Sequence, residues 1–205
     1  MKKLITLAAA LLLVAAGSAH AAKEGTMGGL GFRSLDGPTN TLLNSGVSFT
    51  TSPAIGIRHW FSEKAGVDLA IGFSSLSVEG GNPSTKADEG SGFVFDAGIP
   101  WAVRKWEKVS FIFRPGVTYG TAEAKDKLSA TAPNKETSTF LSVSGELEVE
   151  WMVTDKVSIS AAHGIAYRSL EIKDNASPDA NKIKLTGYDT TGNNFTTLGF
   201  HVYLW

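Results

Sequence analysis

Apolar residues occupy every second position over long stretches of this chain, and small or polar residues fill the positions between them. A period of two places successive side chains on opposite faces of an extended strand, and helical spacing is not sustained anywhere. In one segment, for example, Val67, Leu69 and Ile71 alternate with Asp68 and Ala70. The pattern predicts an all-β fold with six clear strands and two weaker ones: 46–61, 67–74, 93–103, 109–119, 141–151 and 157–167, and then 27–33 and 195–205.

The segments between these predicted strands alternate in length. The sequence predicts short turns and long polar loops, the turns over 62–66, 104–108 and 154–156 and the loops over 34–45, 77–91, 122–137 and 171–191. Such alternation is typical of an eight-stranded antiparallel up-and-down transmembrane β-barrel, with tight turns at one end and larger loops at the other. No boundary interrupts the pattern, so we expect residues 22–205 to form one barrel domain.

The first residues have the composition of a signal peptide. Lys2 and Lys3 precede an apolar stretch over residues 4–16, and Ala19-His20-Ala21 matches a small-residue cleavage pattern. The apolar stretch is shorter than the roughly 20 residues that a membrane-spanning helix needs. We therefore expect residues 1–21 to be removed on export, and the mature protein to leave the cytoplasm.

Composition removes several functional classes. The 205 residues include no cysteine, which excludes disulfide frameworks, thiolate zinc sites and cysteine nucleophiles. The chain carries 19 Lys and Arg against 20 Asp and Glu, and loss of the two leader lysines makes it more acidic. That balance argues against a nucleic acid partner. No metal or other cofactor is expected, because the oxygen-bearing residues of the loop over 171–191 do not have the spacing of a calcium site.

The two faces of the predicted strands distinguish a membrane barrel from a soluble one. The apolar face of the six clear strands carries no charged residue, and a charge at the middle of a bilayer costs about 2 to 4 kcal/mol. The opposite face is mostly Gly, Ser and Ala, which suits a narrow lumen. The tryptophans lie near short turns or the end of the chain, where we expect a girdle at one membrane interface: Trp60, Trp101, Trp106, Trp151 and Trp205. A soluble periplasmic lipocalin-like binding barrel is the alternative.

Charged residues also occur on the face predicted to line the lumen. Glu146, Glu148 and Glu150 share one face of a strand at spacings of about 7 Å. Counting from the turns places Arg114 at the depth of Glu146, and Arg58 at that of Glu150. We expect a lumenal charge network with a formal balance of zero: Arg33, Arg58, Asp68, Asp96, Arg104, Arg114, Glu146, Glu148, Glu150 and Arg168. Paired charges would close a narrow barrel, and the alternative is a gated polar pathway or a cation site.

With its leader, four hairpins and aromatic final residue, the chain resembles the small outer-membrane β-barrel proteins of Gram-negative bacteria, around outer membrane proteins W, X and A. The final strand of those families carries an assembly signal, and the residues here that follow its spacing, with the tryptophan one residue late, are Thr197, Gly199, Val202, Leu204 and Trp205. The resemblance implies a monomer in the outer membrane that contacts lipid, lipopolysaccharide and the assembly machinery. Both termini and the short turns would be periplasmic, and the long loops extracellular.

The same resemblance leaves the role open. The W type implies a lateral route for small apolar compounds, whereas the X and A types imply a closed barrel. Some eight-stranded barrels modify lipid A with His and Ser residues, but the strand around His163 lacks the His-x-Ser arrangement of the deacylase type, and parity places His163 on the lipid face. We therefore expect no enzyme activity and a structural, surface-interaction or small-solute passage role. A lipid A-modifying enzyme is the alternative.

Overall fold

The computed structural model describes residues 27–40, 47–78, 88–126, 134–174, 182–191 and 197–204, and every regular element in these ranges is a β-strand. The strands are β1 (Met27–Asn40), β2 (Val47–Trp60), β3 (Gly66–Val78), β4 (Asp88–Gly98), β5 (Trp101–Lys105), β6 (Val109–Asp126), β7 (Asn134–Met152), β8 (Val157–Asp174), β9 (Lys182–Thr190) and β10 (Thr197–Tyr203). The described part of the chain contains no helix that is long and apolar enough to cross a membrane. The predicted all-β fold class is confirmed.

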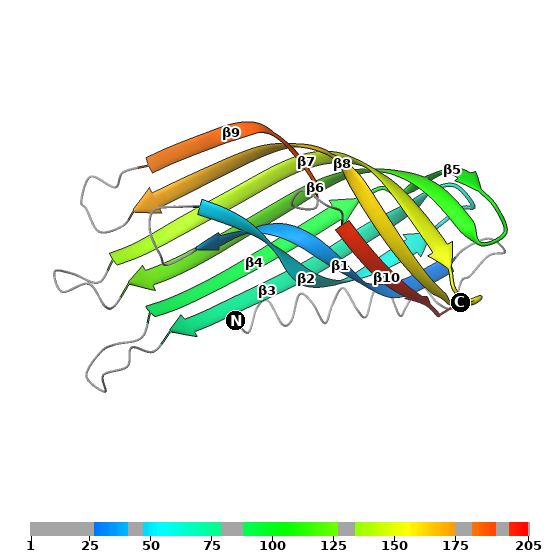
Figure 1. Ribbon diagram of the computed structural model, residues 1–205, viewed down its shortest axis with the longest axis horizontal. Coiled ribbons are helices and arrows are strands. Elements are labelled where there is room, and N and C mark those ends of the chain that lie inside the picture. The colour runs from blue at the N-terminus through cyan, green and yellow to red at the C-terminus, as the bar shows by residue number, and fades with distance from the viewer. Residues whose placement is uncertain are drawn as a thin grey trace.

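The strands form one closed antiparallel barrel with eight positions around its circumference (Figure 1). β1, β2, β3, β6, β7 and β8 each fill one position. β4 and β5 share another position, because both pair with β6, and β9 and β10 share the last, because both pair with β8. The barrel closes where β10 pairs with β1, from Gly29↔Tyr203 to Arg33↔Gly199. The predicted eight-stranded up-and-down barrel is therefore confirmed.

A proline separates β4 from β5, where the sequence predicted one continuous strand over 93–103. Pro100 has no N–H group to donate to a ladder, and its carbonyl accepts a hydrogen bond of 3.0 Å from Gly66 N. Ile99 N donates to Pro115 O at 3.0 Å, which holds the chain against β6. The proline thus changes the hydrogen bonding locally without opening the barrel wall.

Several strands are longer than a membrane crossing requires. β6, β7 and β8 contain 18, 19 and 18 residues, whereas a tilted transmembrane strand needs about 9 to 11. The predicted loops are therefore partly wrong, and β9 lies inside the segment 171–191. Both faces of β9 are exposed, and the apolar alternation in its sequence is short, because Ile183 and Leu185 are followed by Thr186 and Gly187.

The two ends of the barrel differ, and we call them the short-turn end and the loop end. Side-chain oxygens cap the tight turns: Ser62 Oγ accepts from Ala65 N at 3.0 Å, and Thr154 Oγ1 accepts from Val157 N at 3.1 Å. β1 begins and β10 ends at the short-turn end, because β1 starts opposite the last residue of β2 and the backbone of β10 bonds to the turn before β8 (Figure 1).

The outside of the barrel is apolar, and its inside holds the charged residues together with small, polar and some apolar side chains. Leu147, Val103 and Ile165 point away from the axis, with exposed fractions of 70%, 66% and 65%. Side chains of the opposite parity fill the lumen, where small residues such as Ala54 and Ala166 leave room for a narrow closed wall. This arrangement is that of a membrane barrel and the reverse of a lipocalin, whose apolar side chains face inward.

Candidate functional site

Arg58 connects two opposite sides of the lumen. It lies directly across from Asp68 in the β2–β3 ladder and donates from Nε and Nη2 to its two carboxylate oxygens, both at 2.8 Å. The same guanidinium donates from Nη1 and Nη2 to Glu148 of β7 at 2.8 and 2.9 Å. β2 and β7 are not neighbours in the barrel. Because guanidinium and carboxylate pair as two planar forks, Arg58 holds these walls at a fixed separation.

Arg114 is the second buried cation of the lumen. Its Nε donates to Asp68 at 2.9 Å, its Nη1 to Glu146 at 3.2 Å, and its Nη2 to Asp96. Arg114 and Glu146 face each other in the β6–β7 ladder, as their depths predicted. The guanidinium also needs a glycine beside it, because a Cβ at Gly98 would lie 2.3 Å from Cζ of Arg114.

Arg33 and the third glutamate extend the network along the axis. Arg33 is bonded to Glu146 on the side toward the loop end. Toward the short-turn end, Glu150 accepts hydrogen bonds from the hydroxyls of Ser158 and Tyr203, both at 2.7 Å. His201 Nδ1 lies 3.4 Å from Glu150, so a protonated imidazole would join the network there.

The network carries an excess of negative charge, contrary to the balance predicted from sequence. Its directly linked members are three arginines and five carboxylates: Arg33, Arg58 and Arg114, with Asp68, Asp96, Glu146, Glu148 and Glu150. Two predicted cations are elsewhere. Arg168 is buried nearer the loop end and pairs with Asp189 of β9 at 3.0 Å, and Arg104 is outside the barrel.

The prediction that Arg104 lines the lumen is wrong because of a bulge. The β5–β6 ladder shifts register between Ala102 and Arg104, so the residue between them has no partner. One extra residue reverses the alternation of faces. Arg104 therefore lies opposite Phe111 on the outer face, exposed, with Cζ 4.9 Å from the ring centroid of Trp106.

A small hydrophobic cluster fills the lumen at the short-turn end. It contains Trp60, Ala102, Ile112 and Tyr203, with Met27 and Met152 packed against it. The prediction that Trp60 belongs to the interfacial girdle is wrong, since its side chain is 4% exposed. Trp60 is two residues from Arg58 on the same strand, and period two requires both to face inward.

Three other tryptophans lie on the outside of the barrel. Trp101, Trp106 and Trp151 are 52%, 52% and 47% exposed and lie near the short turns. Trp205 is outside the described residues. The other positions of the expected assembly signal occupy the last strand and its end: Thr197 buried, Gly199 and Val202 half-buried, and Leu204 exposed. His163 is exposed on the outer face of β8.

Among the described residues, the ladder that closes the barrel between β1 and β10 is short, and we call the line that continues beyond its end the seam. The ladder between β1 and β10 ends at Arg33↔Gly199, and the described residues of β1 beyond that point have ladder partners only on β2. One residue beyond this last pair, toward the loop end, Leu198 N donates a hydrogen bond of 3.0 Å to Ser34 Oγ and so joins β10 to β1. Beyond Arg33, the described residues of the two closing strands are therefore joined by this side-chain bond and not by a backbone ladder.

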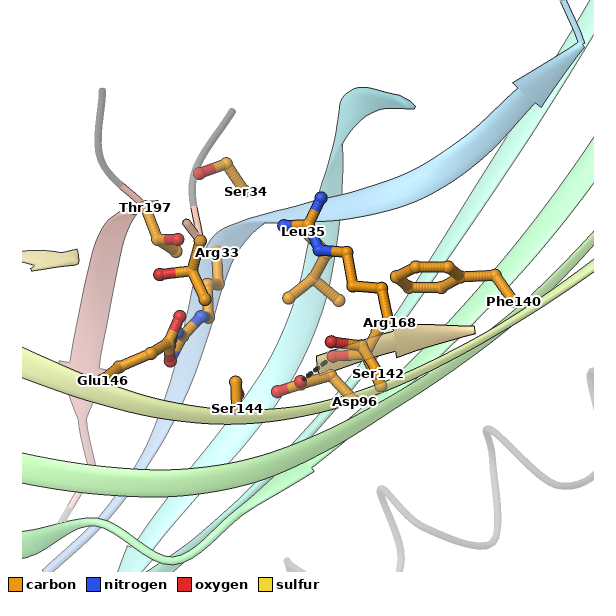
Figure 2. A pocket seen from close by; sticks show the side chains of 12 residues that line it. Arg33, Ser34, Leu35, Asp96, Phe140, Ser142, Ser144, Glu146, Arg168 and Thr197 are labelled. Atoms are coloured by element: carbon orange, nitrogen blue, oxygen red, sulfur yellow. Dashed lines mark hydrogen bonds and ion pairs between the residues drawn. The ribbon is translucent and has the colours of Figure 1, made fainter. Parts of the chain in front are cut away.

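A polar pocket lies behind the seam, on the loop-end side of the charge network (Figure 2). It has a volume of about 340 Å³, its opening to solvent included, and its lining is Arg33, Ser34, Leu35, Asp96, Thr118, Phe140, Ser142, Ser144, Glu146, Arg168, Thr191 and Thr197. Within the described ranges, Arg33 Nε and Thr191 Oγ1 are buried atoms without a hydrogen-bond partner. Both can bond to a polar guest or to water.

Sequence reasoning missed several lumenal residues. His201 and Tyr203 share the inward parity of Gly199, and that parity was the available signal for them. Thr191 gave no signal, because it follows an exposed strand. Among the residues that the structure describes, no three His, Asp or Glu side chains are arranged to hold a metal ion.

Comparison with known proteins places this geometry in a class. No protein family model matches the sequence, and no curated protein matches it. Among solved structures, a major outer membrane protein from Thermus thermophilus is similar with a TM-score of 0.52 at 10% identity, over 89% of this chain and 100% of that chain. Ail, the attachment invasion locus protein of Yersinia pestis, has a TM-score of 0.45 at 15% identity, over 89% and 100%. The outer membrane protein OprG from Pseudomonas aeruginosa has a TM-score of 0.46 at 15% identity, over 87% and 94%.

The fold and the lumen together define the class. The chain has the fold of the small outer-membrane β-barrel proteins, with eight antiparallel strands, an apolar exterior and a lumen of small and paired charged residues. Within that fold, this chain has the network around Arg58 and Arg114, the cluster around Trp60 and the seam beside β1.

Proposed function

We propose that this protein is an integral outer-membrane barrel that is closed to axial flow and has a structural or surface-interaction role without enzyme activity. Two layers close the lumen in series. The charge network joins walls that are not neighbours, and the hydrophobic cluster fills the short-turn end. The observation that carries the proposal is the double pairing of Arg58, because an ion or solute moving along the axis would have to break it.

Current through planar bilayers tests this proposal. Purified protein is refolded and inserted, and insertion is verified by a difference in gel mobility between boiled and unboiled samples. We expect no stepwise currents from the natural sequence. A variant that weakens both closing layers, Trp60→Ala with Arg58→Ala and Glu148→Ala, is expected to conduct and shows that the assay detects an open barrel. Stepwise currents from the natural sequence would contradict the closed barrel.

We further propose that the short turns and both termini are periplasmic and that the loop end is extracellular. Short turns on the periplasmic side are usual for barrels of this type. The absence of cysteine allows a direct test with single substitutions. A membrane-impermeant maleimide applied to intact cells should label Lys184→Cys on exposed β9 and leave Glu107→Cys in a short turn unlabelled. The opposite labelling would reverse the orientation.

The seam favours a second candidate function, passage of small solutes through the barrel wall. Ser34 belongs to the lining of the pocket behind the seam, and beyond the last pair of the β1–β10 ladder the described residues contribute the hydrogen bond between Leu198 and Ser34. A disulfide between Ser34→Cys and Leu198→Cys would close the seam, and swelling of vesicles in small polar solutes measures passage. Slower swelling after oxidation, restored by reduction, would support lateral passage, and equal swelling in both states would exclude it.

A further inference from the structure

The bulge in β5 places a cation on the lipid-facing surface of the barrel. Without the register shift between Ala102 and Arg104, Arg104 would have the inward parity of Ala102. With the shift, Arg104 lies beside Phe111 on the outside, and Val103 is exposed as well. Bulges bend a strand and redirect its side chains. The consequence here is an exposed guanidinium where the neighbouring outward residues are apolar.

The surroundings of Arg104 supply an aromatic base and no described anionic partner. The guanidinium lies over the ring of Trp106, 4.9 Å from its centroid, and that ring packs edge-on against Phe111 at 5.1 Å. Among the described residues, Arg104 forms no ion pair. The segment from Trp101 to Lys108 contains three cations and one acidic residue, Glu107.

The depth of this patch fits a membrane interface. The indoles of Trp101 and Trp106 are about half exposed near the short turns, and tryptophans at the ends of barrel strands lie at the level of lipid headgroups. Lys108 follows in the exposed turn. A guanidinium with free N–H groups is the side chain best suited to two phosphate oxygens, and Lys108, four residues further along the chain, adds positive charge to this turn.

We propose that Arg104, Trp106 and Lys108 bind the phosphate of an anionic phospholipid in the leaflet that surrounds the short-turn end. The proposal rests on the membrane insertion proposed above. Arg104 would donate to the phosphate oxygens while its other face remains on Trp106, and the acyl chains would lie along Val103 and Phe111. The site would thereby fix the depth of the barrel in this leaflet.

Retention of lipid in native mass spectrometry tests the site. The refolded protein is transferred from vesicles of phosphatidylcholine with one fifth phosphatidylglycerol, and the bound phosphatidylglycerol is measured. Arg104→Gln is expected to lower its retention about fivefold, the change that corresponds to about 1 kcal/mol for one basic residue at an anionic membrane surface. Arg104→Lys keeps the positive charge but loses the paired N–H donors of the guanidinium. Its retention of phosphatidylglycerol should lie between that of the natural sequence and that of Arg104→Gln.

Lys105 provides the matched control. It is the next basic residue along β5, but its Nζ lies over Trp60 at the lumenal end, 4.9 Å from the ring centroid. Lys105→Gln changes the net charge equally and should leave retention unchanged. Equal retention in Arg104→Gln and the natural sequence, or an equal loss in Lys105→Gln, would overturn the site.

Failure of the inference can be distinguished from failure of the proposed function. If the protein does not insert into vesicles, boiled and unboiled samples have identical mobility. That result would contradict both the proposed membrane barrel and the lipid site that depends on it. If it inserts but retains phosphatidylglycerol and phosphatidylcholine in proportion to their abundance, only the lipid site is wrong.

Discussion

Arg58 and Glu148 face each other across the lumen from strands that are not neighbours, joined by hydrogen bonds of 2.8 and 2.9 Å. A ladder joins only adjacent strands, so this pair constrains the barrel in a direction that backbone hydrogen bonds do not. Both side chains are almost fully buried. Such a pair is costly to break, because without Arg58 the buried Glu148 keeps only Arg33 as a nearby cation, at 4.0 Å.

Arg114→Ala should destabilise the barrel by about 3 to 5 kcal/mol, since it leaves the buried Asp96 without its cation and removes one of the two cations of Asp68 and of Glu146. Arg104→Ala removes an exposed arginine and should change the free energy of unfolding by about 0.5 kcal/mol or less. Urea unfolding in detergent micelles, followed by tryptophan fluorescence, measures both. An equal effect of the two substitutions would show that the network does not contribute as its geometry indicates.

Second-site substitutions test which partner of Arg114 matters most. Asp96 has Thr118 as its other bonded side chain, whereas Glu146 also has Arg33. Adding Asp96→Ala to the Arg114→Ala variant should therefore restore more of the free energy of unfolding than adding Glu146→Ala. If neither double variant is more stable than Arg114→Ala alone, the pairing is wrong.

The parity of strands made most of the network predictable. Arg58, Arg114 and Glu146 were placed from alternation and from counting residues to the turns, and the structure brings them together. Arg104 could not be placed in this way, because a bulge adds one residue without any local signature such as glycine.

Distance from a turn gives the depth of a residue but not its face. Trp60 was assigned to the interface because it is close to a turn, although its separation of two from Arg58 already implied the lumen. The seam and β9 were beyond prediction for another reason. Pairing across the closing edge depends on long-range register, and the apolar alternation of β9 is limited to Ile183 and Leu185.

Trp60 should be the described tryptophan that lipid does not reach. Trp101, Trp106 and Trp151 are exposed on the outside, and Trp60 is 4% exposed inside the lumen. In vesicles of bromine-labelled lipid, variants that retain a single tryptophan should be quenched for each of the three outer residues and not for Trp60. Quenching of Trp60 equal to that of Trp151 would place it on the outer face after all.

Gly164→Ala should destabilise the barrel by about 1 to 3 kcal/mol, the usual cost of overpacking. A Cβ at Gly164 would lie 2.1 Å from Gly145 O and 2.7 Å from Glu146 Cα, and backbone atoms cannot move aside as a flexible side chain can. Gly187 on β9 is the control, because a Cβ there would meet nothing within 4 Å. Urea unfolding should separate the two, and equal stability of both alanine variants would show that β7 and β8 are not this close.

The two threonines of the pocket behind the seam should respond differently to substitution by valine. Thr118 Oγ1 donates to Asp96 at 2.8 Å, so Thr118→Val removes a hydrogen bond to a charged group and should cost about 1.5 to 3 kcal/mol. Thr191 is 6% exposed and its hydroxyl has no hydrogen-bond partner in the described structure. Thr191→Val keeps the shape and removes a buried polar atom, so the free energy of unfolding should stay the same or rise. Urea unfolding in detergent provides both values. A clear loss of stability in Thr191→Val would mean that the hydroxyl is bonded to ordered water or to a polar guest in the pocket, and Thr118→Val gives the scale against which that loss is judged.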